Sequence, residues 1–349
     1  MDLALTADQE TIRGVFADFF TAEAGPDRAR AAEPLGVDGP AWNRLLETGA
    51  PGMGLPESAG GGGASLTDLA VVAEELGAAI APVPFIEHAV TARLLFATGA
   101  CPDAVVGGTE IATLALRPAQ GGISRLVPAG AVAQHVAGLD GDRLVLASGD
   151  APGVALGNHG CLPLADRPLG DATILLEGTE AHAAHARALD EWRTLTAGAL
   201  VGIGRTALDL GVDYAKERQQ FGKPIGSFQA VQHLLADLPG LIEGARLLAA
   251  KAAWAGDGGP GINGINDLDN NDITDFATLA GMALVLAGEA AATATDRSLH
   301  VHGGYGFAEE YDIQLFYRRA RAWALTLGDP ARECRRIADL LLEPSEHAA

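Results

Sequence analysis

The pattern of apolar residues changes twice along this chain, near residues 108 and 185, and this change constrains the fold more than any other feature. Between these points the sequence consists of short runs such as IATLAL, RLVLAS and ATILLEG, separated by turn signals such as DGD, which is typical of a small antiparallel β unit. On both sides, apolar residues recur at steps of three and four, as in amphipathic helices. The sequence therefore predicts a mainly α fold with a small β domain: an N-terminal helical domain (1–107), a middle β domain (108–185) and a helical C-terminal domain (186–349).

Capping residues predict where the N-terminal helices begin. Thr6 stands before the apolar stripe of TADQETIRGVFADFF, and Ser65 is followed three places later by Asp68, a spacing that resembles a capping box. Gly77 comes at the end of the second helical run, and glycine is the usual residue just beyond a helix C-terminus. We therefore expect one helix after Thr6 and another after Ser65, the second ending at Gly77.

The C-terminal part opens with a helical run that is rich in small residues. The run keeps a helical period through Ala197, Leu200, Val201, Gly204, Ala207, Leu208, Gly211 and Tyr214. Because small side chains let helices approach closely, the run predicts packing in a helix bundle or at an oligomer interface. Pro239 and Gly240 are expected to interrupt the next helix, since proline removes a backbone N–H and clashes with the preceding turn.

Charge and composition exclude several function classes. A net charge of −21 repels a phosphate backbone, so a nucleic acid is not expected as a partner. The N-terminus carries acids before any long apolar run, unlike a signal peptide, and no window approaches the roughly 18 uninterrupted apolar residues of a membrane span. Cys101, Cys161 and Cys334 lie far apart, which is the pattern of free thiols. We expect a soluble cytoplasmic protein without membrane contact.

The sequence predicts no metal site. The segment DLDNNDITD (267–275) resembles a calcium loop, but Asp272 stands where such a loop needs glycine and Thr278 where it needs glutamate. His300 and His302 are close in sequence, yet no third ligand accompanies them. Whether residues 256–275 bind a cation stays open at this point.

Three segments of the chain resemble the acyl-CoA dehydrogenase family, in the family's own order. They are GLPESAGGGGASLTDLAVVAEELG (54–77), RQQFGKPIGSFQ (218–229) and VHGGYGFAEEYDIQLFYRRARAW (301–323). The resemblance implies an N-terminal helical domain, a middle β domain and a C-terminal four-helix bundle, in a tetramer built as a pair of dimers. It further implies FAD and the α,β-dehydrogenation of an acyl-CoA thioester, in which a carboxylate removes the α-proton and the β-hydrogen leaves as hydride to the flavin.

One half of the flavin site in this family serves the neighbouring subunit, and its residues have counterparts here. The resemblance implies that Arg218, Phe221 and Gln229 reach across a dimer to the neighbour's FAD. The chemistry agrees, because a guanidinium suits a pyrophosphate and an aromatic ring can pack against the cofactor.

The H-G-G-x-G segment supplies further residues of the same half. The resemblance places Gly303 and Gly304 beside the adenosine part of FAD, where a residue without Cβ lets the backbone come close. His300 stands where the family usually has a glutamine that contacts the cofactor, and imidazole can still donate one hydrogen bond.

The half that would hold this chain's own flavin is absent from the sequence. Residues 108–185 contain neither the T-E-P-x-x-G-S-D-like segment nor the W-I-[ST]-like strand of the family, and no Trp occurs between Trp42 and Trp192. The catalytic carboxylate is missing as well, because the family register places Leu327 at the usual glutamate. Some relatives carry the base on the adjoining bundle helix, where Glu243 and Asp237 are the nearby acids.

Both absences fall on the same functional half, which favours a subunit that completes a partner's active site. The arrangement resembles a bacterial subgroup, associated with sterol side-chain breakdown, in which two different chains form an α₂β₂ heterotetramer with fewer flavin sites than chains. Two alternatives stay open. One is a self-sufficient homotetramer with a relocated base, for which Glu243 is the weak candidate, and the other is a structural homologue without flavin.

Overall fold

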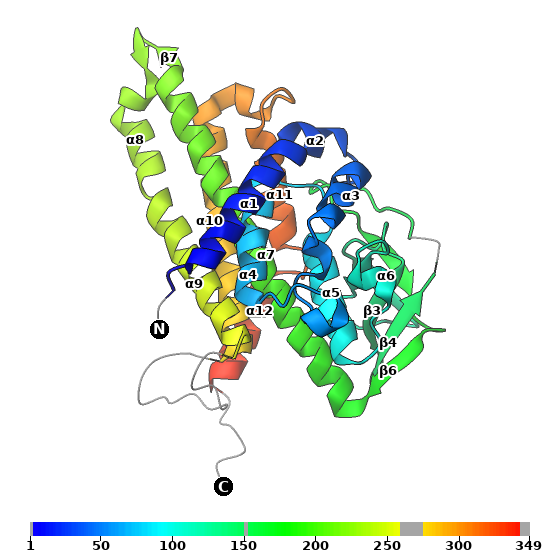
Figure 1. Ribbon diagram of the computed structural model, residues 1–349. Coiled ribbons are helices and arrows are strands. Elements are labelled where there is room, and N and C mark those ends of the chain that lie inside the picture. The colour runs from blue at the N-terminus through cyan, green and yellow to red at the C-terminus, as the bar shows by residue number, and fades with distance from the viewer. Residues whose placement is uncertain (1–2, 150–152, 259–274, 343–349) are drawn as a thin grey trace. The chain divides into compact units, whose positions relative to one another are not determined.

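The computed structural model describes residues 3–149, 153–258 and 275–342 (Figure 1). The calcium-like segment that the sequence left open lies almost entirely outside these residues. Helices dominate before residue 107 and after residue 177, and short strands fill the part between them, which confirms the predicted mainly α fold with a small β domain.

The elements follow in the order α, β, α. The N-terminal helices are α1 (Ala7–Glu23), α2 (Pro26–Ala31), α3 (Gly39–Glu47), α4 (Leu66–Ala79), α5 (Phe85–Ala97) and α6 (Asp103–Val106). The strands are β1 (Ala112–Leu114), β2 (Ile123–Val127), β3 (His135–Asp140), β4 (Arg143–Ser148), β5 (Ala165–Pro168) and β6 (Thr173–Glu177). After them come α7 (Gly178–Glu217), β7 (Gln219–Gln220), β8 (Lys223–Pro224), α8 (Gln229–Ala236), α9 (Leu238–Gly256), α10 (Phe276–His302), the 3₁₀ turn η5 (Gly303–Phe307), α11 (Ile313–Ala324) and α12 (Pro330–Leu342).

The β part contains a four-stranded sheet in the order β1-β3-β4-β6 and the separate pair β2-β5. Its small core contains Ala115, Val127, Val136, Val145 and Leu169. The sequence suggested a small antiparallel unit, and this was wrong for one pair, because β1 runs parallel to β3. A parallel pair needs a crossover connection; here β2 and the loop after it lie between the two strands in sequence.

The predicted helix starts are confirmed. The Thr6 side chain accepts from the backbone of Gln9, whose own side chain accepts in return, and Ser65 and Asp68 form the same reciprocal pair at 2.9 and 3.1 Å. The predicted end at Gly77 was wrong, because α4 continues to Ala79. Position 77 requires a glycine because the backbone of α7 at Ala199 lies against it.

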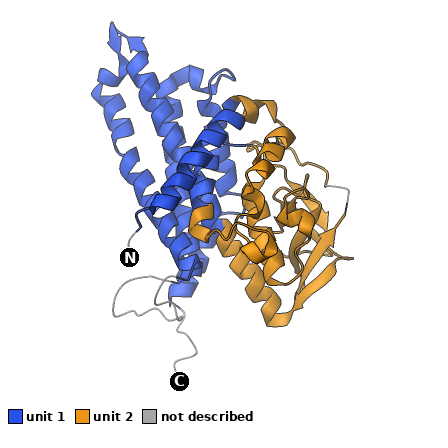
Figure 2. Ribbon diagram, in the orientation of Figure 1, with its two compact units in different colours: residues 1–26, 70–81, 193–349 blue, residues 27–69, 82–192 orange. Residues whose placement is uncertain are grey.

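Contacts along the chain group it into two compact units, shown in Figure 2. One unit contains residues 1–26, 70–81 and 193–349, and the other contains residues 27–69 and 82–192. The three domain ranges drawn from the sequence stay a prediction beside this grouping.

The first unit contains the C-terminal four-helix bundle, in which the second half of α7, α8 with α9, α10 and α11 run along one another (Figure 1). The helix is interrupted near Pro239, as expected: α8 ends at Ala236 and α9 starts at Leu238. Gly204 of α7 faces Ala291 of α10 and Ile242 of α9, so the small residues of α7 are packed within the bundle.

Two helices, Gly178–Glu217 and Phe276–Phe307, are long and apolar enough to meet the length and hydropathy criteria of a membrane span in the described part of the chain. Of their most apolar windows, 67% and 61% are buried inside the fold, as in the core helices of a bundle.

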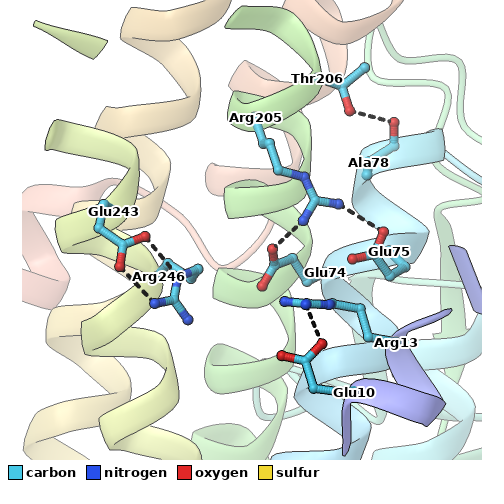
Figure 3. Close-up of polar contacts among 9 residues, drawn as sticks. All are labelled: Glu10, Arg13, Glu74, Glu75, Ala78, Arg205, Thr206, Glu243 and Arg246. Carbon is cyan, nitrogen blue, oxygen red and sulfur yellow. Dashed lines mark hydrogen bonds and ion pairs between the residues drawn. The ribbon is translucent and has the colours of Figure 1, made fainter. Parts of the chain in front are cut away.

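The closest backbone approach in the bundle unit joins α4 to α7. A Cβ built on Gly77 would lie 1.9 Å from the carbonyl oxygen of Ala199, and one built on Gly202 would lie 1.9 Å from that of Glu74. Ion pairs and a hydrogen bond extend the contact by one further turn (Figure 3): Arg205 reaches Glu74 and Glu75, both at 2.7 Å, and the Thr206 hydroxyl donates to Ala78 O at 2.9 Å. Desolvation raises the pKa of Glu74 despite the guanidinium of Arg205 beside it.

We predict that Gly202→Ala destabilises the protein by about 1–3 kcal/mol, because the new methyl group overlaps a backbone carbonyl that cannot move without shifting α4. Gly204→Ala, two positions along the same helix, is the matched control. Its Cβ would meet Ala291 and Ile242 at an ordinary 3.5 Å, and alanine is favoured over glycine inside a helix by about 0.5–1 kcal/mol. Denaturant unfolding measures both. Equal midpoints for the two variants would contradict the close approach.

Candidate flavin-contact surface

A two-residue hairpin follows directly after α7 and presents the first group of predicted site residues. β7 and β8 pair antiparallel through Gln219–Pro224 and Gln220–Lys223, with Phe221 and Gly222 at the turn. Both turn residues have left-handed backbones, with φ of 53° and 76°, as the twist of a two-residue hairpin requires. Glycine adopts this conformation freely, but phenylalanine does so at a cost of about 1 kcal/mol or more.

Phe221 is almost fully exposed. The residue is 93% accessible, and its ring contacts that of Phe228 edge-on, with centroids 6.1 Å apart. An exposed ring on a left-handed backbone does not stabilise the fold of this chain, because the ring is not buried and the turn is strained. The ring is therefore available for a contact outside its own chain.

Arg218 lies at the base of the hairpin, where its guanidinium carbon is 5.3 Å from the centre of the Tyr305 ring. Its backbone holds the hairpin closed, because Arg218 O accepts from Ile225 N at 2.8 Å. In the described part of the chain no acidic side chain pairs with Arg218, although most arginines of the bundle unit have a carboxylate partner. The guanidinium is positioned by a ring and leaves its charge available to an anion.

Gly303 and Gly304 form the start of η5, directly after α10. A Cβ built on either residue would meet no atom of this chain within 4 Å, and both residues are exposed. The packing of this chain thus gives no reason for Gly304 to lack a side chain. The open space above its backbone suits the close approach of a group from outside the chain.

Gln229 and His300 lie on neighbouring helices of the same unit. Gln229 is the first residue of α8 and His300 belongs to the last turn of α10, and both are exposed. The two helices are joined where Arg297 donates to Leu234 O at 3.1 Å. The contacts bring Arg218 and η5 together, whereas Gln229 and His300 are presented beside them on separate elements.

Leu327, which the sequence resemblance places at the usual catalytic glutamate, is half-buried in the wall of a cavity of about 360 Å³ between α10, α11 and the start of α12. Three carboxylates, Glu289, Asp329 and Glu333, share this wall. Glu333 is 8% exposed and held by two arginines, with Arg193 Nε at 3.0 Å and Arg336 at 2.6 Å. A carboxylate clamped in this way is a structural ion-pair partner and is poorly suited to abstract a proton.

Sequence reasoning missed Glu333, because its partner Arg193 is 140 residues away and no spacing rule connects the two. In the sequence, only their opposite charges could have indicated that these two residues pair.

Glu243, the weak candidate for a relocated base, is exposed on α9 and is not among the residues that line the Leu327 cavity. Figure 3 shows its carboxylate facing Arg246, with both oxygens accepting from that guanidinium at 2.6 and 2.8 Å. Arg246 thereby holds the pKa of Glu243 below its usual value. The other acid considered from sequence, Asp237, is exposed and pairs with Arg297 at 3.3 Å.

The β part offers no aromatic side chain to the isoalloxazine ring of a flavin. Residues 97–191 contain no Phe, Tyr or Trp that could pack against a planar ring. A cavity of about 640 Å³ lies in this unit, and its wall is composed mainly of glycine, alanine and short side chains around Arg167. Arg218, Phe221 and Gly304 thus offer a cation, an exposed ring and an open stretch of backbone, whereas the β part offers no aromatic platform.

No group of three or more His, Cys, Asp or Glu side chains with metal-binding geometry occurs in residues 3–149, 153–258 and 275–342. His302 is used in packing: its Nδ1–H donates to Ser298 O at 2.7 Å, and its ring stacks on Tyr214 with centroids 4.1 Å apart. Burial lowers its pKa.

Comparison with known proteins identifies the class. The chain matches the N-terminal domain model of acyl-CoA dehydrogenases over residues 6–100 and the C-terminal domain model over residues 182–342. Acyl-CoA dehydrogenase IpdE2 of Mycolicibacterium smegmatis is 30% identical over 344 residues, which cover 95% of this chain and 98% of that protein. The chain belongs to the acyl-CoA dehydrogenase family, so the predicted family and enzyme class are confirmed.

Two solved structures are similar over nearly the whole chain. The Tcur3481-Tcur3483 steroid ACAD has a TM-score of 0.80 at 29% identity, covering 96% of this chain and 97% of that one. The ChsE4-ChsE5 complex from Mycobacterium tuberculosis has a TM-score of 0.79 at 25% identity, covering 99% of this chain and 100% of that one.

We predict that Glu243→Gln leaves the acyl-CoA dehydrogenase activity of the assembled protein within about twofold of the parent, because an exposed carboxylate paired with Arg246 is neither basic enough nor enclosed enough to remove an α-proton. Steady-state kcat with an acyl-CoA substrate measures this. Arg246→Ala serves as the control, since freeing Glu243 would shift the pH profile only if that carboxylate were the base. A loss of activity of about 100-fold or more in Glu243→Gln would support the self-sufficient alternative.

Proposed function

We propose that this chain is one subunit of a heteromeric, FAD-dependent acyl-CoA dehydrogenase, and that it completes the flavin site of a partner chain while lacking a catalytic base of its own. The observation that carries the proposal is Phe221, which is 93% exposed on a strained turn beside an arginine without an acidic partner.

The exposed surface supports a role toward a partner's cofactor. Arg218 offers a guanidinium to phosphate oxygens, and Phe221 offers a ring for packing. Gly304 leaves its backbone open to close approach. All three lie in the bundle unit, where each is open to a ligand that another subunit holds.

The residues around Leu327 support the proposal that this chain depends on a partner for the catalytic base. Leu327 cannot accept a proton, and Glu333, buried in the same cavity wall, is engaged by Arg193 and Arg336. The β unit adds no aromatic platform for a flavin ring. These features agree with one another, because a chain that binds no flavin ring of its own needs no base beside it.

The relatives support a heteromeric assembly and a steroid substrate class. One similar structure is described as a steroid ACAD that combines Tcur3481 with Tcur3483, and the other is a ChsE4-ChsE5 complex. We assign this chain the same kind of assembly, an α₂β₂ heterotetramer with a second acyl-CoA dehydrogenase chain. The substrate is an acyl-CoA thioester, and its acyl group carries a steroid.

FAD is the cofactor, and when bound it supplies the acceptor for the hydride that leaves the β-carbon of the substrate. The residues of this chain bind and orient it from one side. Arg218 neutralises phosphate charge, Phe221 excludes water from the cofactor, and Gln229 and His300 contribute hydrogen-bond donors. The proton abstraction belongs to the partner chain.

Flavin content per chain tests the proposal directly. Purified alone, this chain is expected to bind less than about 0.1 FAD per chain, because the residues that fit FAD occupy one side only. Co-expressed with its partner, the complex is expected to carry about one FAD for every two chains. Flavin absorbance and native mass, measured on the same sample, give both numbers.

Two outcomes would contradict the proposal. About one FAD per chain in a homotetramer would support the self-sufficient enzyme, and a partner complex with unchanged flavin content after Arg218→Ala would support a structural homologue without a role at the flavin.

A further inference from the structure

A series of aromatic rings connects Arg218 to the bundle. Tyr214 of α7 stacks on His302 of α10, with centroids 4.1 Å apart, and Tyr311 meets both rings edge-on at 6.2 and 6.0 Å. Tyr305 of η5 lies 5.7 Å from Tyr311, and the guanidinium of Arg218 lies over the Tyr305 ring. Tyr305 is thus the last ring of the series and the one that touches the arginine.

The inner rings are fixed and the outer one is open. His302 is 7% exposed and donates to Ser298 O, so it holds the stack in place. Tyr305 is 50% exposed. The guanidinium carbon of Arg218 lies over this ring, 5.3 Å from its centre, and a cation–π contact needs no hydrogen bond from the guanidinium N–H groups.

We propose that Tyr305 is a positioning residue for Arg218: its ring holds the guanidinium with its N–H donors directed outward, ready for the diphosphate of a flavin nucleotide held by the partner subunit. This inference rests on the proposed function and adds the residue that makes Arg218 effective. An acidic side chain could also position the arginine, but it would neutralise the charge and compete with the phosphate. An aromatic face avoids that competition.

The proposal distinguishes the ring of Tyr305 from its hydroxyl. Tyr305→Phe keeps the ring and is expected to leave FAD affinity within about twofold of the parent, whereas Tyr305→Leu removes the cation–π contact and is expected to weaken FAD binding about fivefold. Arg218→Ala removes the charge itself and is expected to weaken binding about tenfold or more. In Arg218→Ala, adding Tyr305→Leu should change nothing further, since the ring then has no arginine to hold.

The experiment uses the assembled complex of this chain with its partner, stripped of flavin and titrated with FAD at 50 and 300 mM NaCl. Flavin fluorescence reports the dissociation constant. The affinity of the parent is expected to fall with salt, and the fall should be smaller in Arg218→Ala and in Tyr305→Leu, because both lose an effective cation at the phosphate. Native mass and the melting temperature check that each variant assembles. Should Tyr305→Leu fail to assemble, Tyr305→Gln, which also lacks a ring, replaces it.

The outcomes separate this inference from the proposed function. No effect of Arg218→Ala would overturn the proposed function and the inference with it. A weakened Arg218→Ala together with a normal Tyr305→Leu would overturn the inference alone. Additive losses in the double variant, or a loss in Tyr305→Phe equal to that in Tyr305→Leu, would overturn it as well, because the tyrosine would then act directly on the cofactor.

Discussion

The close contact of α4 with α7 is the constraint on which the bundle unit depends. At Gly77 and Gly202 the two backbones approach so closely that a single methyl group on either would overlap a carbonyl oxygen at 1.9 Å. Such an approach brings the carboxylates of Glu74 and Glu75 within reach of one guanidinium, Arg205, and the fixed separation makes the ion pairs possible. α7 continues from this contact without interruption to residue 217. Within the bundle unit, the contact therefore helps to position the end of α7 and the hairpin of Phe221 that follows it.

The hairpin after α7 holds Phe221 in a conformation that is unfavourable by itself. A phenylalanine with a left-handed backbone and an exposed ring lowers the stability of the chain by itself, and such strain persists only where the surrounding structure determines the conformation. Here the surrounding structure consists of the Arg218–Ile225 backbone hydrogen bond, the ring series behind Arg218, and the end of α7. On the proposed function, the strain is offset when the ring is covered in the assembled complex.

Sequence patterns predicted the elements well and their closest contacts poorly. The α, β, α order and the caps at Thr6 and Ser65 depend on neighbours within four residues, so they could be read directly. The interpretation of Gly77 as a terminator was wrong, because a glycine that ends a helix and one that admits another backbone look the same in sequence. The family motif indicated Arg218 and Phe221 by residue number, yet neither the exposure of Phe221 nor the ring beneath Arg218 could be inferred, since Tyr305 lies 87 positions further along the chain. Glu333 was missed for the same reason.

Arg218 differs from several other arginines of the bundle unit in the group that it contacts. In the bundle unit, arginines near carboxylates serve the fold: Arg205 holds two glutamates, and Arg193 with Arg336 clamps Glu333. Arg218 differs, because an aromatic ring replaces the carboxylate and its charge is not consumed within the chain. Its contact with the exposed Tyr305 ring contributes only modestly to the stability of the fold. On the proposed function, the open charge of Arg218 serves a ligand that carries negative charge, and the lack of Phe, Tyr and Trp in residues 97–191 agrees with a flavin ring that a neighbouring chain holds.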